Sequence, residues 1–219
     1  MNNDQAPPRD YSAVDRLIGA FDQLIRTAAP AMQPATRPSP AEGQPELPLM
    51  PSERRHSAGL MRVNHTGEVC AQALYLGQSL VARDDQLKRF LTDASAEERD
   101  HLIWCAERLA ELKSRPSILN PAWYVGSIAI ALAAAAISDA VSLGFVEETE
   151  RQVCAHLEGH LTELSADDRR SRAIVDAMGA DEAQHAINAR RYGASELPEP
   201  VKRLMGAQAR VMTILAYWL

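Results

Sequence analysis

Residues 90–109 read FLTDASAEERDHLIWCAERL. Apolar side chains recur in this stretch every three or four residues, which is the spacing of an amphipathic helix. Glu98 and His101 fall inside the apolar stripe rather than on the polar face. Because residues three apart project from the same side of a helix, this Glu-x-x-His pair can offer a carboxylate and an imidazole to one point.

The same pattern returns in residues 174–189, which read IVDAMGADEAQHAINA. Here Glu182 and His185 lie in line with Ile174, Met178 and Ala189. One Glu-x-x-His in a helical protein usually has a structural explanation, because a histidine can be hydrogen-bonded in a core or lie at the surface. Two copies, each within an apolar stripe, are much harder to explain by packing alone.

Glu98 also has a local alternative that involves no metal. Ser95 precedes it by three residues, so the two could form a capping box at the start of a helix. In that case Glu98 would be the third helical residue, and its carboxylate would bond to backbone.

Two further helical stretches each place an acid on the expected buried stripe. Glu68 is in line with Met61, Asn64, Ala71 and Tyr75. Glu150 is in line with Leu143, Val146, Val153 and Leu157. Buried acids without partners are strongly unfavourable, so acids on four core stripes indicate a shared positive partner.

Three acids compete in the third of these helices. Glu147 is followed four residues later by Arg151, and Glu148 by Gln152, as on a solvated face. Glu150 instead has valines at positions 146 and 153. Periodicity alone therefore favours Glu150 as the ligand.

The complete set is typical of one kind of metal site. One Glu from each of two helices, with a Glu-x-x-His from each of two others, is the ligand set of ferritin-like di-iron and di-manganese bundles. Carboxylates can bridge two metals, and neutral imidazole suits iron. Four glutamates would also balance the charge of two ferrous ions. We therefore predict an all-α, ferritin-like four-helix bundle with additional helices, with metal ligands Glu68, Glu98, His101, Glu150, Glu182 and His185.

Composition agrees with a helical protein and excludes some other classes. Hydrophobic residues make up 46% and aromatic residues only 5% of the 219 residues. The formal net charge of -6 gives no basic field for nucleic acid. The three cysteines are far apart and form no CxxC pair, so we expect neither disulfides nor a zinc site. This use of cysteine is typical of a protein in the reducing cytoplasm. No basic-then-apolar leader follows the polar N-terminus, so no secretory signal is expected.

We expect two regions along the chain. Residues 1–51 should hold a short amphipathic helix at 11–28 and then a proline-rich linker, with seven prolines in 30–51. Residues 52–219 should form the metal-binding domain and end in a helix at the membrane interface. Helices are predicted over 53–82, 86–113, 121–164, 168–192 and 198–218, the third kinked or split near Ser138-Asp139.

Residues 53–219 resemble the demethoxyubiquinone hydroxylase family, the di-iron monooxygenases of ubiquinone biosynthesis. The stretches that carry the resemblance are RVNHTGE (62–68), AQALY (71–75), ERDHL (98–102), TERQVCAHL (149–157) and DEAQH (181–185). The NHTGE block is much more specific than Glu-x-x-His. The acidic Glu147-Glu148 pair and the first 51 residues fall outside the shared pattern.

The resemblance implies a reaction and its reactants. A polyprenyl methoxy-methyl-benzoquinol would be hydroxylated by dioxygen at a centre of two Fe ions, with one oxygen atom entering the ring and the other leaving as water. The six ligands match the family's position by position, with Glu98 and Glu182 as the natural bridges. His156 matches a family histidine near the site. An electron donor and other ubiquinone-biosynthesis proteins would be partners.

A polyprenyl substrate implies contact with a membrane. Residues 116–138 carry no charge and could form a packed core helix, a lipid-facing or tail-binding wall, or a membrane span. Residues 200–219 carry Lys202, Arg203 and Arg210 beside apolar residues and Tyr217-Trp218, which suits either an interfacial helix or a helix capping the bundle. We expect a peripheral protein on the cytoplasmic face of the cell membrane.

Gly67 stands inside a predicted helix beside Glu68. A glycine there costs about 1 kcal/mol relative to alanine, so it indicates either room for substrate or close helix packing. Two other functions fit the ligand set: an oxidase or peroxidase of rubrerythrin type, and iron storage. Storage needs a polar iron path, which the apolar 116–138 segment does not favour.

Overall fold

The computed structural model describes residues 34–219. The predicted helix at 11–28 lies outside the described residues. The helices are α2 (Pro51–Val81), α3 (Asp85–Glu111), α4 (Asn120–Ile137), α5 (Asp139–Glu163), α6 (Arg169–Arg191) and α7 (Glu199–Trp218). The described part of the chain contains no strand, which confirms the all-α prediction.

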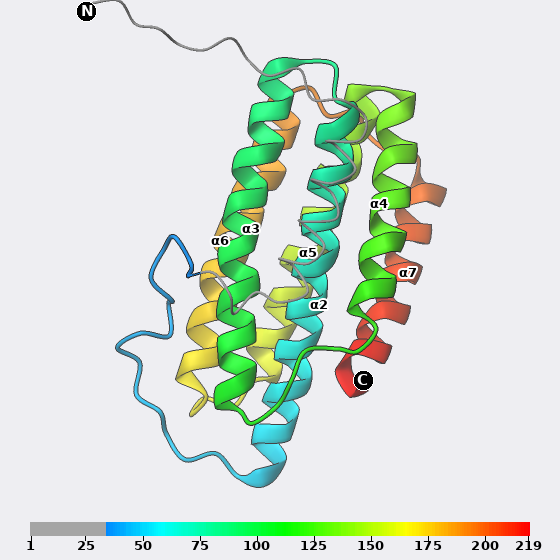
Figure 1. Ribbon diagram of the computed structural model, residues 1–219. Coiled ribbons are helices and arrows are strands. Elements are labelled where there is room, and N and C mark those ends of the chain that lie inside the picture. Colours follow the sequence, from blue (N-terminus) through cyan, green and yellow to red (C-terminus); the bar gives the residue numbers. More distant parts are fainter. Residues whose placement is uncertain (1–33) are drawn as a thin grey trace, which may run out of the picture.

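The core is a bundle of α2, α3, α5 and α6 (Figure 1). The hairpin of α2 and α3 packs against the hairpin of α5 and α6. The additional helices α4 and α7 lie on the same side of the bundle, at the right of the view, and both pack on α2 and α5. The ferritin-like four-helix bundle with additional helices is therefore confirmed.

The long helix predicted over 121–164 is divided at Ser138. This residue is extended, with φ -168° and ψ 161°, and serves as the C-cap of α4 and the N-cap of α5. Its side-chain oxygen accepts a hydrogen bond from the Val141 backbone N–H at 3.1 Å. A serine that satisfies an exposed N–H at the first turn is a strong start signal, which explains why the break falls here.

The capping box proposed for Ser95 and Glu98 is not formed. α3 begins at Asp85, and Asp84 caps it by accepting hydrogen bonds from the backbone N–H groups of Gln86 and Leu87. Ser95 therefore lies well inside the helix, where its hydroxyl contacts the Gln72 side chain at 3.1 Å. Glu98 has no capping role and is free to face the core.

Residues 34–50 form no helix, yet they are not a detached linker. They run along the outside of the bundle, at the left of the view in Figure 1, before entering α2. Ala41 and Leu49 are buried against the bundle. The described part of the proline-rich segment therefore packs onto the domain that follows it.

Two apolar clusters occupy the bundle interior at different heights. Met61, Cys105, Leu157 and Met178 belong to one cluster. Tyr75, Leu91, Leu143 and Ala189 belong to the other. On each core helix the predicted metal ligands lie between these two levels, so the site is enclosed above and below by apolar side chains.

Candidate metal centre

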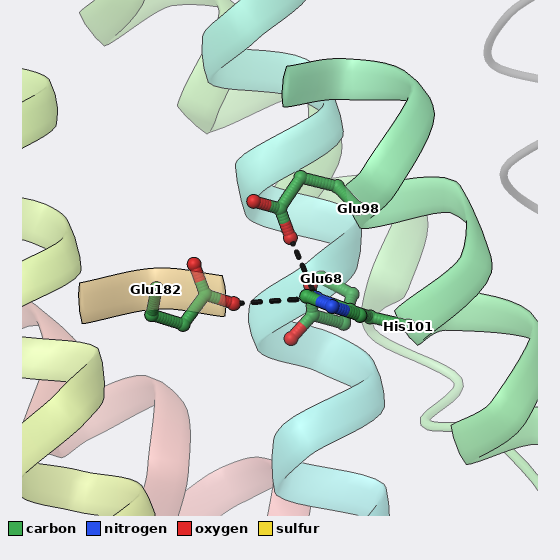
Figure 2. A group of neighbouring side chains, drawn as sticks. All are labelled: Glu68, Glu98, His101 and Glu182. Atoms are coloured by element: carbon green, nitrogen blue, oxygen red, sulfur yellow. Dashed lines mark hydrogen bonds and ion pairs between the residues drawn. The ribbon is translucent and has the colours of Figure 1, made fainter. Parts of the chain in front are cut away.

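The six predicted ligands meet in the centre of the bundle. α2 supplies Glu68, α5 supplies Glu150, and α3 and α6 each supply a Glu-x-x-His pair. All six residues are buried, none exposed by more than 3%. Figure 2 shows Glu98 and Glu182 pointing towards His101, with Glu68 beside it. Helical spacing places each acid inward, and the packing of four helices brings them to one place.

Their ligand atoms form two overlapping groups, each within 4.8 Å. The first group comprises Glu68, Glu98, His101 and Glu182. The second comprises Glu98, Glu150, Glu182 and His185. Two groups that could each hold a metal ion therefore lie side by side, and they share Glu98 and Glu182.

The two shared glutamates turn one oxygen towards each histidine. For Glu98, Oε2 is 3.1 Å from His101 Nδ1, and Oε1 is 2.9 Å from His185 Nδ1. For Glu182, Oε1 is 3.3 Å from His101 Nδ1, and Oε2 is 3.2 Å from His185 Nδ1. A carboxylate with one oxygen in each half of the site could hold two metal ions at once.

Glu68 and Glu150 each belong to one half only. Glu68 Oε2 is 3.7 Å from His101 Nδ1 and is buried without a hydrogen-bond partner among the described residues. Glu150 Oε1 accepts a hydrogen bond from the Tyr75 hydroxyl at 2.6 Å. A buried carboxylate oxygen without a donor is costly, and a cation beside it would supply the missing partner. The donor set thus fits two hard or borderline cations such as iron or manganese.

The structure also separates the three acids of α5. Glu150 faces the other ligands, as periodicity predicts. Glu147 points to Arg190, at 3.3 Å. Glu148 differs from the expectation of a solvated face, because it is buried and accepts hydrogen bonds from Arg151 and Gln152. It is buried near α7, where the Gln152 amide also contacts the Lys202 carbonyl, rather than in the bundle centre.

Two supporting acids were missed by the sequence reasoning. Asp181 accepts from His101 Nε2 at 2.8 Å, and Glu97 accepts from His185 Nε2 at 2.8 Å. Each acid stands directly before the glutamate of a Glu-x-x-His pair, yet it supports the histidine of the opposite helix. Such contacts fix the ring orientation and tautomer of a ligating histidine. The acid that precedes each glutamate can be seen in the sequence. The sequence does not show that each acid contacts the histidine of the other helix.

Burial and mutual repulsion control the protons of the acids. Burial raises the pKa of Glu68 well above its ordinary value, and the charge of Glu98 raises it further. Burial, then the charges of Glu182 and Glu98, raise the pKa of Glu150 in the same way. Burial also raises the pKa of Glu98, but hydrogen bonds from the two histidines outweigh it, so that this pKa is lowered.

The histidines hold protons strongly in the absence of metal. Burial lowers the pKa of His101, but hydrogen bonds to Asp181 and Glu182 outweigh burial and raise it well above its ordinary value. Burial also lowers the pKa of His185, but hydrogen bonds to Glu182 and Glu98 outweigh burial and raise this pKa to about 12. Protons thus balance the acids, and metal cations would have to displace them.

Two non-ligand residues of the NHTGE block, His65 and Thr66, hold α4 against the bundle. The Thr66 hydroxyl donates to Asn120 Oδ1 at 2.9 Å, and Asn120 Nδ2 lies 3.2 Å from His65 Nδ1. Burial lowers the pKa of His65 to about 4, so this ring is neutral. The specific motif therefore combines one candidate ligand, Glu68, with the attachment of a neighbouring helix.

A cavity of about 350 Å³ leads from the surface to the ligands. It lies between α2, α4, α5 and α7, and its walls are mostly apolar. Glu68, Glu150 and Glu182 line its inner end, and Gly67 and His156 also line it. His156 belongs to neither ligand group, so the structure places it beside the site rather than in it.

Comparison with known proteins gives consistent matches. The family model described as "Ubiquinone biosynthesis protein COQ7" matches residues 55–216. A "3-demethoxyubiquinol 3-hydroxylase" of Paracidovorax citrulli is 54% identical over 204 residues, 93% of this chain and 99% of that protein. Proteins of the same name from Burkholderia cenocepacia and Bordetella parapertussis are also 54% identical, over 94% and 96% of this chain and 99% and 95% of their own lengths.

Proposed function

Because the chain belongs to the ubiquinone biosynthesis protein COQ7 family, we propose that it hydroxylates the ring of a demethoxyubiquinol with dioxygen at a centre of two iron ions. The reaction places one oxygen atom on a ring carbon and releases the other as water, so it consumes two electrons from a donor. Bound ferrous ions would supply the oxygen-activating redox chemistry.

The observation that carries this proposal is the cavity that ends at the candidate ligands. Its volume of about 350 Å³ falls within the range of small-molecule sites, and its apolar walls suit a quinol ring and the first part of a polyprenyl tail. Glu68 and Glu150 each line both the cavity and one half of the ligand set. A ring in the cavity would therefore lie next to both metal positions. Iron storage would need a polar path instead.

Residues of the chain would hold the two irons, balance their charge and keep water away from them. Glu68, Glu98, Glu150 and Glu182 would hold the two irons with His101 and His185, and four carboxylates balance the charge of two ferrous ions. Tyr75 would keep Glu150 in place through its hydrogen bond. The apolar clusters on both sides would keep bulk water away from the reacting atoms.

Gly67 provides a test of both the chemistry and the binding site. A Cβ atom at this position would meet no atom within 4 Å, so the residue opens space in the cavity rather than allowing close helix packing.

The experiment loads the protein anaerobically with iron, reduces it and then adds labelled dioxygen. The unaltered protein should bind two irons per chain. It should also place one labelled atom in a short-tailed demethoxyubiquinol. Gly67→Phe should keep both irons but lose most turnover, because the ring fills the cavity.

Gly67→Ala is the matched control. It should retain turnover and raise the free energy of unfolding by about 1 kcal/mol, since alanine is the better helix former. Unlabelled product, or full activity of Gly67→Phe, would contradict the proposed reaction or the proposed site.

We further propose that α4 and α7 rest on the cytoplasmic face of the cell membrane. By length and composition α4 could cross a membrane, and only 33% of its residues are buried inside the protein, unlike a packed core helix. Large apolar side chains on the two helices are exposed: Val125, Leu132, Ile137, Leu204, Val211, Ile214 and Trp218. Other residues of α4 and α7 line the cavity, so this exposed α4–α7 face would let a polyprenyl tail pass from lipid to the site.

Point substitutions can test this proposal, because the end of α7 also belongs to the core. Ala216 is fully buried and Tyr217 packs on Gly59, so truncation would damage the bundle. The combined change Val211→Ser, Ile214→Ser and Trp218→Ser should reduce binding to anionic liposomes, at about 25 cal/mol per Å² of apolar area. Iron content and helicity should stay unchanged.

Ile187→Ser on α6 is the control, because Ile187 is exposed but lies off the α4–α7 face. It should not change liposome binding. Unchanged binding of the triple variant would contradict the membrane proposal.

A further inference from the structure

Residues 34–50, here called the N-terminal strap, are attached to the bundle near both ends. Near the far end, Glu46 pairs with Arg108 at 2.8 Å and with Arg170 at 3.3 Å. Near the first end, Thr36 and Arg37 bind at the level of the candidate metal centre. The strap is therefore a segment distant in sequence from the candidate ligands that nevertheless docks beside them.

The first attachment is made to Asp100, the residue before His101. Its carboxylate is buried and accepts from the Thr36 backbone N–H at 2.8 Å and from the Thr36 hydroxyl at 2.6 Å. It also accepts from the Arg37 backbone N–H at 3.1 Å and from Arg37 Nε at 3.3 Å. Four donors from two adjacent strap residues hold this carboxylate.

The Arg37 guanidinium reaches beyond Asp100 to the second Glu-x-x-His helix. Its terminal nitrogen Nη1 donates to Asp181 Oδ2 at 2.8 Å, and its Cζ atom lies 4.9 Å from the Trp104 ring centre. The same Asp181 oxygen contacts His101 Nε2 at 2.8 Å. Arg37 thus links α3 and α6 and fixes the acid that orients His101.

The other half of the site has no equivalent. His185 Nε2 contacts Glu97, whose side chain is 49% exposed. Within residues 34–219, no arginine or lysine pairs with Glu97. A cation therefore braces the acid behind His101 but not the acid behind His185.

We propose that Arg37 is a positioning residue of the metal centre and that the docked strap controls metal retention in the half formed by Glu68 and His101. By holding Asp181, Arg37 keeps the His101 Nε2–H directed to that acid and Nδ1 directed to the metal position. The planar fork suits two carboxylates at once, which the single ammonium of lysine does not. The inference rests on the proposed two-iron centre.

Coupling of this kind acts in both directions. If a docked strap favours metal in this half of the site, metal there must favour the docked strap by the same factor. Loading the site should therefore slow backbone hydrogen exchange in residues 34–50. That effect is a second measurement, independent of activity.

The test compares full-length variants loaded anaerobically with two ⁵⁷Fe(II) per chain. Iron release to a ferrous chelator is followed, and Mössbauer spectra report the two iron environments separately. Arg37→Gln should release one of the two irons faster, by up to the roughly 10- to 100-fold expected if Asp181, the partner of His101, were itself lost. The other iron should be retained, and exchange of the strap should no longer respond to metal.

Glu46→Gln is the matched control, because it removes the ion pairs at the far end of the strap. It should loosen only the far end of the strap, because Thr36 and Arg37 stay docked on Asp100, and it should leave iron release unchanged. The rate of iron release from Arg37→Lys should fall between the rates from Arg37→Gln and from the unaltered protein. If Arg37→Gln does not fold, Arg37→Lys takes its place in the comparison. Equal release from all variants, or equal acceleration by Glu46→Gln and Arg37→Gln, would overturn the inference. An unaltered protein that does not bind two irons would instead overturn the proposed function.

Discussion

Replacing Glu98 with alanine should abolish binding of both irons, and Glu182→Ala should do the same. Each of these carboxylates turns one oxygen to the His101 half and one to the His185 half. Loss of either removes a ligand from both metals at once, and the remaining cations would lie close together with less negative charge between them. The expected result is almost no iron by metal analysis and no hydroxylation.

Glu68→Ala is the control for this prediction, because Glu68 belongs to one ligand group only. It should lower the iron content towards one per chain and leave the His185 half occupied. Circular dichroism should give the same helicity for all three variants, so that lost iron can be separated from lost fold. Two irons in the Glu98→Ala protein would remove the bridging assignment.

The second large effect is expected at Glu150. Glu150→Gln should lose the iron of the His185 half and nearly all hydroxylation, because an amide oxygen binds a ferrous ion far more weakly than a carboxylate does. The fold should remain, since the Tyr75 hydroxyl can still donate to the amide oxygen at the same position. Iron content and turnover measure the two consequences.

Glu148→Gln is a demanding control, because Glu148 is buried as well. Its partners are Arg151 and Gln152 rather than the ligands, and Arg151 is largely exposed. The variant should keep two irons and most activity, and its free energy of unfolding should fall by about 1 kcal/mol or less. Glu147→Gln should behave similarly. An inactive, iron-poor Glu148→Gln protein would mean that α5 presents a different face to the site.

Much of this architecture follows from local spacing. Apolar residues at helical intervals determined the positions of the helices, and Ser138 marked the division of α4 from α5 through its capping side chain. The i and i+3 spacing of Glu98 with His101, and of Glu182 with His185, determined which side chains share a face. These features depend on residues within one or two turns of each other, so a sequence contains them directly.

Other features depend on which helices become neighbours. The burial of Glu148 arises from its packing beside α7, and the crossed support of Asp181 for His101 and Glu97 for His185 arises from the pairing of α3 with α6. The docking of Arg37 on Asp100 and Asp181 joins segments 63 and 144 residues apart. Local spacing carries no information about such distant contacts. The sequence by itself thus determined the helices and the six candidate ligands, whereas only the tertiary structure decided what surrounds and supports them.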